Sequence, residues 1–119
     1  MIPKQKLIII SPEEKVAAAD LKMVRNNIGG LPVVREDGTL VGIITQRDIL
    51  LSRFHQIGEL KVADLMSKNP ITVSEETSLK QILNVMINKK IERLPVVKGN
   101  KIVGLIVHDK ILQAFVKFL

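Results

Sequence analysis

The chain of 119 residues carries 18 basic and 12 acidic side chains, for a formal net charge of +6, and 46% of its residues are hydrophobic. This length fits one compact module or two small halves that share a core, and the charge favours anionic partners in general. The absence of cysteine excludes disulfides and thiol catalysis, and three phenylalanines without Trp or Tyr leave little for unpaired bases to stack on.

The chain opens with a predicted strand and a predicted helix. Residues 7–10 form a short apolar run that predicts a buried strand. Ser11 and Pro12 then predict the start of a helix, and Asn27 predicts its end. Apolar residues at a spacing of three or four predict the buried face of this helix: Ala17, Leu21, Val24 and Ile28.

A hairpin and a second helix follow. Residues 31–34 and 40–44 predict two strands joined by a turn at 35–38. Gly42 would allow another segment to approach its strand closely. Ile49, Leu50 and Phe54 then recur at helical spacing and predict a helix that runs to about His55.

Thr45 and Asp48 stand where the second strand meets this helix. One interpretation is structural: Thr45 caps the helix and Asp48 complements its dipole. The other is functional, because a carboxylate at such a junction can accept hydrogen bonds from the hydroxyls of a ribose. The residues alone leave both interpretations open.

The same order of elements then begins again. At an offset of 63 residues Ser11 matches Ser74, Met23 matches Met86, and the Leu-Pro-Val-Val of 31–34 matches 94–97. After a hairpin one residue shorter, the Val-Gly of 41–42 matches 103–104. An internal duplication explains these identities. We expect an α/β (α+β) fold of two strand-helix-strand-strand-helix repeats, 1–60 and 61–119, packed with approximate two-fold symmetry.

The second repeat has its own predicted elements. Residues 61–66 predict a short helical entry, 71–73 a strand, and Thr77 or Ser78 the cap of a helix. An apolar stripe predicts the buried face of that helix: Leu79, Ile82, Leu83, Met86 and Ile87. Met86 can be read as a ligand or as core, and its partner Met23 favours core. Residues 108–119 carry more apolar surface than one helix face needs, which predicts a subunit contact.

With the repeat established, the chain resembles a tandem pair of CBS domains, a regulatory module, here as a stand-alone protein. The resemblance covers essentially all residues and depends on the order of several short motifs. These motifs are the Ile-Thr-Val-Ser of 71–74, both Leu-Pro-Val-Val strands, both Val-Gly strands and the Gly-Ile-Ile-Thr-Gln-Arg-Asp of 42–48.

The resemblance implies a cleft between the repeats that binds an adenosine-containing ligand: AMP, ADP, ATP or S-adenosylmethionine. In the family a Thr or Ser followed three residues later by Asp holds the ribose, which matches Thr45 and Asp48. The resemblance places the adenine against Ile43, Ile71, Thr72 and Ile91, and a phosphate against Arg93. Arg93 beside Glu92 is alternatively a solvated surface charge. Dimers are common in the family, so the resemblance also implies a homodimer.

The second repeat departs from the motif, because Val107 and Lys110 replace the hydroxyl and the carboxylate. We therefore expect one competent site per chain and a degenerate second cleft, where His108 and Lys110 could contact an anion.

No catalytic or metal constellation is present in the sequence. His55 and His108 are the only histidines, and neither lies in a metal-ligand spacing or near a nucleophile motif. We therefore expect a ligand-sensing module and not an enzyme, with a protein effector as a further partner. The alternative is a scaffold that binds nucleic acid or protein without a nucleotide ligand. No apolar run approaches transmembrane or signal-peptide length, so we expect a cytoplasmic location without membrane contact.

Overall fold

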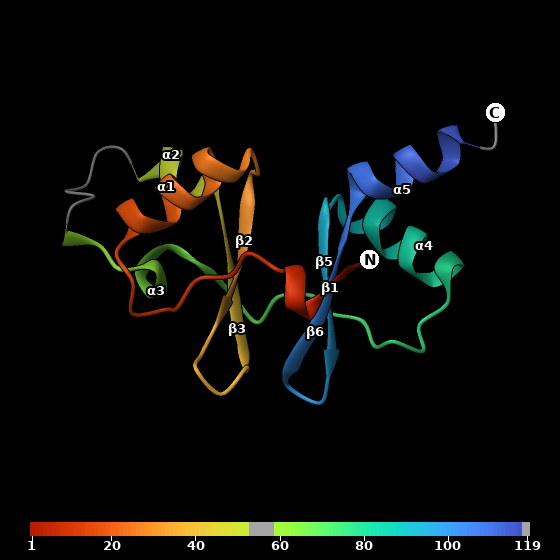
Figure 1. The fold of residues 1–119 in the computed structure, drawn as a ribbon, viewed down its shortest axis with the longest axis horizontal. Helices are drawn as coiled ribbons and strands as arrows, with labels where there is room; N and C mark the ends of the chain where they lie inside the picture. Colours follow the sequence, from red (N-terminus) through yellow and green to blue (C-terminus); the bar gives the residue numbers. More distant parts are fainter. Residues whose placement is uncertain (53–58, 118–119) are drawn as a thin grey trace. The chain divides into compact units, whose positions relative to one another are not determined.

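The computed structural model describes residues 1–52 and 59–117, which form two compact units (Figure 1). The first-repeat unit is Ile8–Pro70, and the second-repeat unit combines Met1–Leu7 with Ile71–Leu119. Residues 1–7 and 61–70 thus belong to the unit of the opposite sequence repeat. Each unit has a three-stranded sheet flanked by helices, which confirms the expected α+β fold class.

The sheet of the first-repeat unit is built on the expected hairpin. Strands β2 (Gly30–Val34) and β3 (Leu40–Thr45) pair antiparallel, and β4 (Ser67–Lys68) pairs with the other edge of β3. The turn includes Gly38 at a φ of 89°, a conformation that glycine adopts at little cost. Helices α1 (Val16–Asn26), α2 (Gln46–Leu51) and α3 (Val62–Leu65) lie to the left of this sheet in Figure 1. The predicted positions 54 and 55 of the second helix lie outside the described residues.

Two expectations about the start of this unit are wrong. Of residues 7–10, only Ile10 pairs, in a single parallel bridge to Val33. Helix α1 begins at Val16 after the N-cap Lys15, and not at Ser11. The reason is that backbone groups of residues 12–16 are hydrogen-bonded to residues 60–63, which keeps this stretch out of the helix.

The buried face of α1 also differs from the expected one. Val16, Ala19 and Met23 are buried, whereas Leu21 and Val24 are exposed. Both sets are apolar at helical spacing, so periodicity alone could not select the face that packs on the sheet. The predicted end of the helix is confirmed, because Asn27 adopts the left-handed conformation that closes it.

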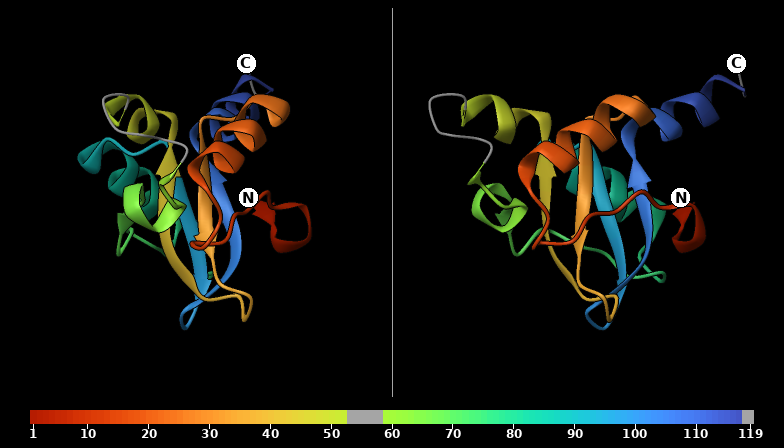
Figure 2. Two further views of the ribbon diagram at one scale, coloured as in Figure 1. Left: turned by 90° about the vertical axis from the view of Figure 1, so that its left-hand side faces the viewer. Right: turned by 60° about the vertical axis from the view of Figure 1, so that its left-hand side comes forward.

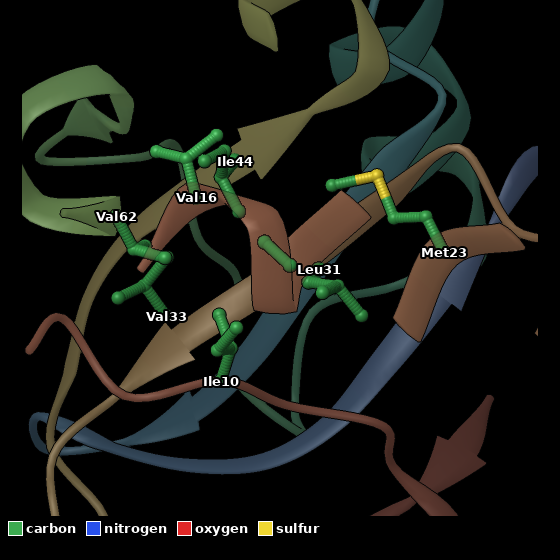
Figure 3. Packing of buried hydrophobic residues seen from close by; sticks show 8 residues of the cluster. Ile10, Val16, Met23, Leu31, Val33, Ile44 and Val62 are labelled. Carbon is green, nitrogen blue, oxygen red and sulfur yellow. The ribbon is translucent and has the colours of Figure 1, made fainter. Parts of the chain in front are cut away.

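The core of the first-repeat unit joins its helices to its hairpin. Figure 3 shows Val16 of α1, Ile44 of β3 and Val62 of α3 gathered in one cluster, and all three are fully buried. The other buried members are Ile10, Ala19, Met23, Leu31 and Val33. Short α3 is therefore part of the core, although it contributes only four helical residues.

The second-repeat unit repeats this plan. Strands β5 (Arg93–Lys98) and β6 (Lys101–Val107) form the hairpin, and β1 (Ile2–Pro3) pairs with the free edge of β6 (Figure 2). A 3-10 turn, η1 (Lys4–Lys6), follows β1. Of the strand predicted at 71–73, only Val73 pairs, in a parallel bridge to Val96.

Helices α4 (Leu79–Lys89) and α5 (His108–Val116) complete this unit. Ser78 caps α4, and it is one of the two residues that the sequence offered as the cap. Ile82 and Met86 are buried, so the core interpretation of Met86 is confirmed, but Leu79 and Ile87 of the predicted stripe are exposed. On α5, Leu112, Phe115 and Val116 are exposed.

Each third strand approaches a glycine of its hairpin. A side chain added at Gly42 would meet Met66 Sδ and the Ser67 carbonyl oxygen, both at 2.7 Å. One added at Gly104 would meet Met1 Sδ at 2.5 Å. The expected close approach at Gly42 is thereby confirmed. Since Gly42 and Gly104 occupy matching positions of the repeat, Met66 and Met1 do as well.

Candidate functional site

The junction between β3 and α2 brings Thr45 and Asp48 into direct contact. The Thr45 N–H and hydroxyl both donate hydrogen bonds to Asp48 Oδ2, at 2.8 and 3.0 Å. The Asp48 N–H donates in return to Thr45 Oγ1 at 3.3 Å. This reciprocal arrangement is a capping box, so the structural interpretation of the two residues is confirmed.

The capping box leaves part of the carboxylate available. A carboxylate has about four acceptor positions, and the two capping bonds use only Oδ2. Within the described part of the chain, Asp48 Oδ1 accepts no hydrogen bond. Both side chains are half-buried, so the box holds Oδ1 in a defined orientation at the surface of the unit.

The strand beside Thr45 has no side chain at the position that pairs with it. Thr45 pairs across the sheet with Gly30, which has no side chain, and the Gln46 N–H donates to the Gly29 carbonyl at 3.0 Å. Ile43, two residues before Thr45, is half-buried. The first-repeat unit thus places three predicted site residues, Ile43, Thr45 and Asp48, on one strand end and the helix start that follows it.

The matching junction of the second-repeat unit has different chemistry. Val107 precedes α5 and provides no side-chain cap, and Lys110 stands where Asp48 stands in the first unit. Arg93 pairs across the sheet with Val107, in the place of Gly30. Its guanidinium lies 3.8 Å from Glu92 Oε2 and its side chain is 22% exposed.

The remaining predicted residues all belong to the second-repeat unit. Ile71 and Thr72 are exposed ahead of the bridge at Val73, and Ile91 is half-buried against the core. His108 and Lys110 are exposed at the start of α5, where His108 Nδ1 lies 3.5 Å from Asp109 Oδ1. The structure brings Arg93 close to the start of α5. A shared site with Thr45 and Asp48 stays a prediction.

A pocket in the second-repeat unit was not expected from the sequence. It has a volume of about 250 Å³ and is lined by Met1, Leu79, Ile106, Val107, Lys110, Ile111, Ala114 and Phe115. Seven of these side chains are apolar, and Lys110 is the charged one. No local sequence signal predicts this pocket, because Met1 reaches the second-repeat unit through the pairing of β1 with β6.

Two further properties concern the whole described chain. In residues 1–52 and 59–117, no cluster of three or more His, Asp or Glu side chains is arranged to hold a metal ion. No described helix combines the length and the apolar character of a membrane span.

The duplicated hairpin-and-helix units define a two-repeat module with one hydroxyl-carboxylate junction. The CBS domain family model matches residues 1–54 and 62–117. The chain belongs to this family, with one CBS domain in each repeat, which confirms the resemblance noted from the sequence.

Two relatives with described sequences show what the chain is similar to. It is 38% identical over 96 residues to the uncharacterized protein YlbB of Bacillus subtilis, with 78% of this chain and 65% of YlbB covered. It is 41% identical over 101 residues to the inosine-5'-monophosphate dehydrogenase of Korarchaeum cryptofilum, with 84% of this chain but 20% of the dehydrogenase covered. The chain thus spans less than two thirds of these relatives, and a fifth of the dehydrogenase.

A solved structure is similar over nearly the whole chain. CBSX2, a CBS-pair protein from Arabidopsis thaliana, has been crystallised in complex with AMP. That complex has a TM-score of 0.89 and 29% identity to this chain, and covers 99% of this chain and 93% of CBSX2.

Proposed function

We propose that the protein is a regulatory module that senses an adenosine-containing ligand, with one competent site per chain at Thr45 and Asp48. The observation that carries the proposal is the Asp48 carboxylate, whose Oδ2 is held by the capping box while Oδ1 accepts no hydrogen bond from the described residues. Oδ1 retains acceptor positions for the hydroxyls of a ribose. The AMP complex of the similar protein CBSX2 supports this ligand class.

The proposal assigns different roles to the two junctions. In the second-repeat unit Lys110 has three donors and no acceptor, so it cannot accept hydrogen bonds from a ribose. Val107 also removes the hydroxyl that orients the carboxylate in the first unit. His108 and Lys110 would suit an anion at this degenerate junction.

Calorimetric titration with AMP, ATP and S-adenosylmethionine tests the proposed site. We expect Asp48→Ala to weaken binding of the preferred ligand by about tenfold or more, because hydrogen bonds to a charged group are lost. Asp64→Ala is the matched control, since Asp64 also closes a helix start by accepting from the Lys61 N–H at 2.8 Å. Equal affinities in the wild type and Asp48→Ala would remove Asp48 from the site.

Arg93 is proposed as a phosphate contact of the same ligand. Its side chain is mostly buried beside the start of α5, and its guanidinium makes a long ion pair with Glu92. If Arg93 contacts the phosphate, Arg93→Gln should weaken the binding of AMP and leave the affinity for adenosine unchanged. If Arg93 only forms its ion pair with Glu92, the affinities for AMP and adenosine both stay at the wild-type value. Ile71, Thr72 and Ile91 remain proposed contacts of the adenine.

A homodimer is proposed through the outer face of α5. Leu112 and Val116 are one helical turn apart, are 51% and 66% exposed, and do not line the pocket. Replacing both by Glu should shift the protein from dimer to monomer in sedimentation velocity. A wild type that is already monomeric would contradict this proposal.

A second candidate function is binding of a polyanion by the second-repeat unit. Residues 8–70 carry eight basic and eight acidic side chains, whereas the rest of the chain carries ten basic and four acidic. The entire net charge of +6 therefore lies in one unit. Such binding should weaken steeply as salt rises, because counterions are released on association.

A further inference from the structure

The turn end of the second-repeat hairpin gathers basic side chains. Lys98 ends β5 and Lys101 begins β6, with two residues between them. Residue numbers rise along β1 as they fall along its partner β6, so the chain leaves β1 toward this turn. The 3-10 turn η1, which carries Lys4 and Lys6, follows at once and contacts β6 (Figure 1). We call Lys4, Lys6, Lys98 and Lys101 the lysine patch.

The lysine patch has little negative charge around it. Residues 1–7 and 93–107 contain no Asp or Glu. Lys4, Lys6 and Lys98 are exposed, and none of the three makes an ion pair with another residue that the structure describes. Lys98 and Lys101 also pair directly across the two strands, and like charges in this arrangement cost stability. An anion from outside the chain would relieve this repulsion.

The matching place in the first-repeat unit shows that the fold does not require these lysines. Its hairpin turn has Arg35 followed by Glu36 and Asp37, and its edge strand β4 contributes Lys68. Two basic and two acidic side chains cancel there, whereas the lysine patch has four basic side chains and no acidic one. The positive charge is therefore a property of the second unit and not of the duplicated scaffold.

We propose that the lysine patch binds the phosphodiester backbone of double-stranded nucleic acid. The inference rests on the second candidate function, polyanion binding, and assigns a site and a ligand class to it. A duplex carries one negative charge per about 1.7 Å of its axis, which suits several lysines that lie close together. Lysine acts on phosphate as a point charge, so this binding is independent of the base sequence.

The polar residues between the lysines favour a duplex over two other anionic partners. Gln5, Gly99 and Asn100 are exposed in the patch. None of them is aromatic, so unpaired bases of a single strand have nothing to stack on. None of them is a large apolar residue that would insert into a lipid surface. Contacts to phosphates therefore have to supply the affinity.

Fluorescence anisotropy with a labelled DNA duplex of about 20 base pairs at about 50 mM salt tests the site. The variant Lys4→Gln, Lys6→Gln, Lys98→Gln should bind at least about tenfold more weakly than the wild type, because phosphate contacts are lost. The slope of log affinity against log salt should fall by about one for each lysine that contacts a phosphate. All three positions are exposed, so the Tm should stay near that of the wild type.

A second triple variant is the matched control. Lys80→Gln, Lys89→Gln, Lys117→Gln removes the same charge from exposed positions on α4 and at the end of α5. We expect this variant to keep the wild-type salt slope and most of the affinity. Equal losses of affinity and slope in the two triple variants would overturn the proposal, because binding would then depend on the overall charge.

Two other probes test the ligand class. A single strand of the same length should bind more weakly than the duplex, because its charge density is lower and the patch has no aromatic side chain. A single strand that binds as tightly as the duplex would overturn the assignment to double-stranded nucleic acid. Patch-dependent binding to phosphatidylserine vesicles without binding to the duplex would do the same.

Heparin chromatography distinguishes failure of the site from failure of the underlying function. If the wild type is retained on heparin and the patch variant binds the duplex as tightly as the wild type, polyanion binding stands and the lysine patch is not its site. If the wild type neither binds the duplex nor is retained on heparin, both proposals are overturned. No adenosine ligand is used, so these results are independent of the site at Thr45 and Asp48.

Discussion

The two units share a fold and differ in the chemistry of matched positions. Each has a hairpin, a third strand that packs on a glycine, and a helix that starts where the hairpin ends. At that start one unit has Thr45 and Asp48, and the other has Val107 and Lys110. The duplicated scaffold thus keeps its hairpin and its glycine contact, while the residues at the matched helix starts differ in chemistry.

The difference extends to what each unit buries. Residues 60–66 complete the core of the first unit, whereas the matching surface of the second unit is a pocket. Charge follows the same division, since all of the net positive charge lies in the second unit. The first-repeat unit is therefore the better candidate for binding a nucleoside, and the second-repeat unit is the better candidate for binding additional partners.

The largest expected contrast comes from introducing Asp at the first residue of α1 and at the first residue of α4, which are matched positions of the repeat. Val16→Asp buries an unpaired charge in the core and should lower the free energy of unfolding by about 3 kcal/mol or more. Leu79→Asp should change it by less than about 1 kcal/mol, because Leu79 is mostly exposed. Urea denaturation of both variants measures the contrast. Equal losses would show that the surface around Leu79 is covered in the folded protein.

The two glycines should differ by a smaller amount. Gly42→Ala collides with the Ser67 carbonyl oxygen, so the edge strand must shift, at a cost of about 2 kcal/mol. At Gly104 the nearest group is the flexible end of Met1, and we expect a loss of about 1 kcal/mol or less. Thermal and urea unfolding compare the two, and a larger loss at Gly104 would contradict this packing.

Restoring the motif in the second unit should stabilise its last helix. Val107→Thr combined with Lys110→Asp gives α5 the capping box that α2 has, worth about 1 kcal/mol. Hydrogen exchange of the first amides of α5 should slow in this variant. Thr45→Val is the reverse change and should speed exchange at α2; unchanged exchange in both variants would contradict the capping role.

The smallest effect concerns the charge difference between the hairpin turns. Lys98→Glu in the second unit should reduce retention on heparin, and Arg35→Glu in the first unit should leave it nearly unchanged, if the second unit binds polyanions. The retention of wild type should fall steeply with salt. Equal effects of both substitutions would assign retention to overall charge alone.

The repeat, both hairpins and the capping of α2 could be predicted from the sequence, because these features depend on local turn chemistry and on identities at fixed offsets. The buried face of α1 could not, since Leu21 and Val24 form as regular a stripe as Val16 and Met23. The start of α1 was also missed. Long-range hydrogen bonds to residues 60–63 decide it, and no local pattern records them.

The candidate site was predictable only in its local part. Thr45 and Asp48 are neighbours on one helix start, so their contact follows from spacing. The pocket beside Leu79 depends on Met1 reaching the sheet of the opposite repeat, which requires the strand pairing itself. Sequence reasoning therefore identified the hydroxyl-carboxylate pair and missed the pocket.

Ligand stoichiometry tests the functional difference between the two units most directly. Calorimetric titration of the wild type with AMP should give one ligand per chain, and the Val107→Thr, Lys110→Asp variant should move toward two. Two ligands per wild-type chain, or one ligand that Asp48→Ala leaves in place, would contradict the assignment of the site to the first repeat.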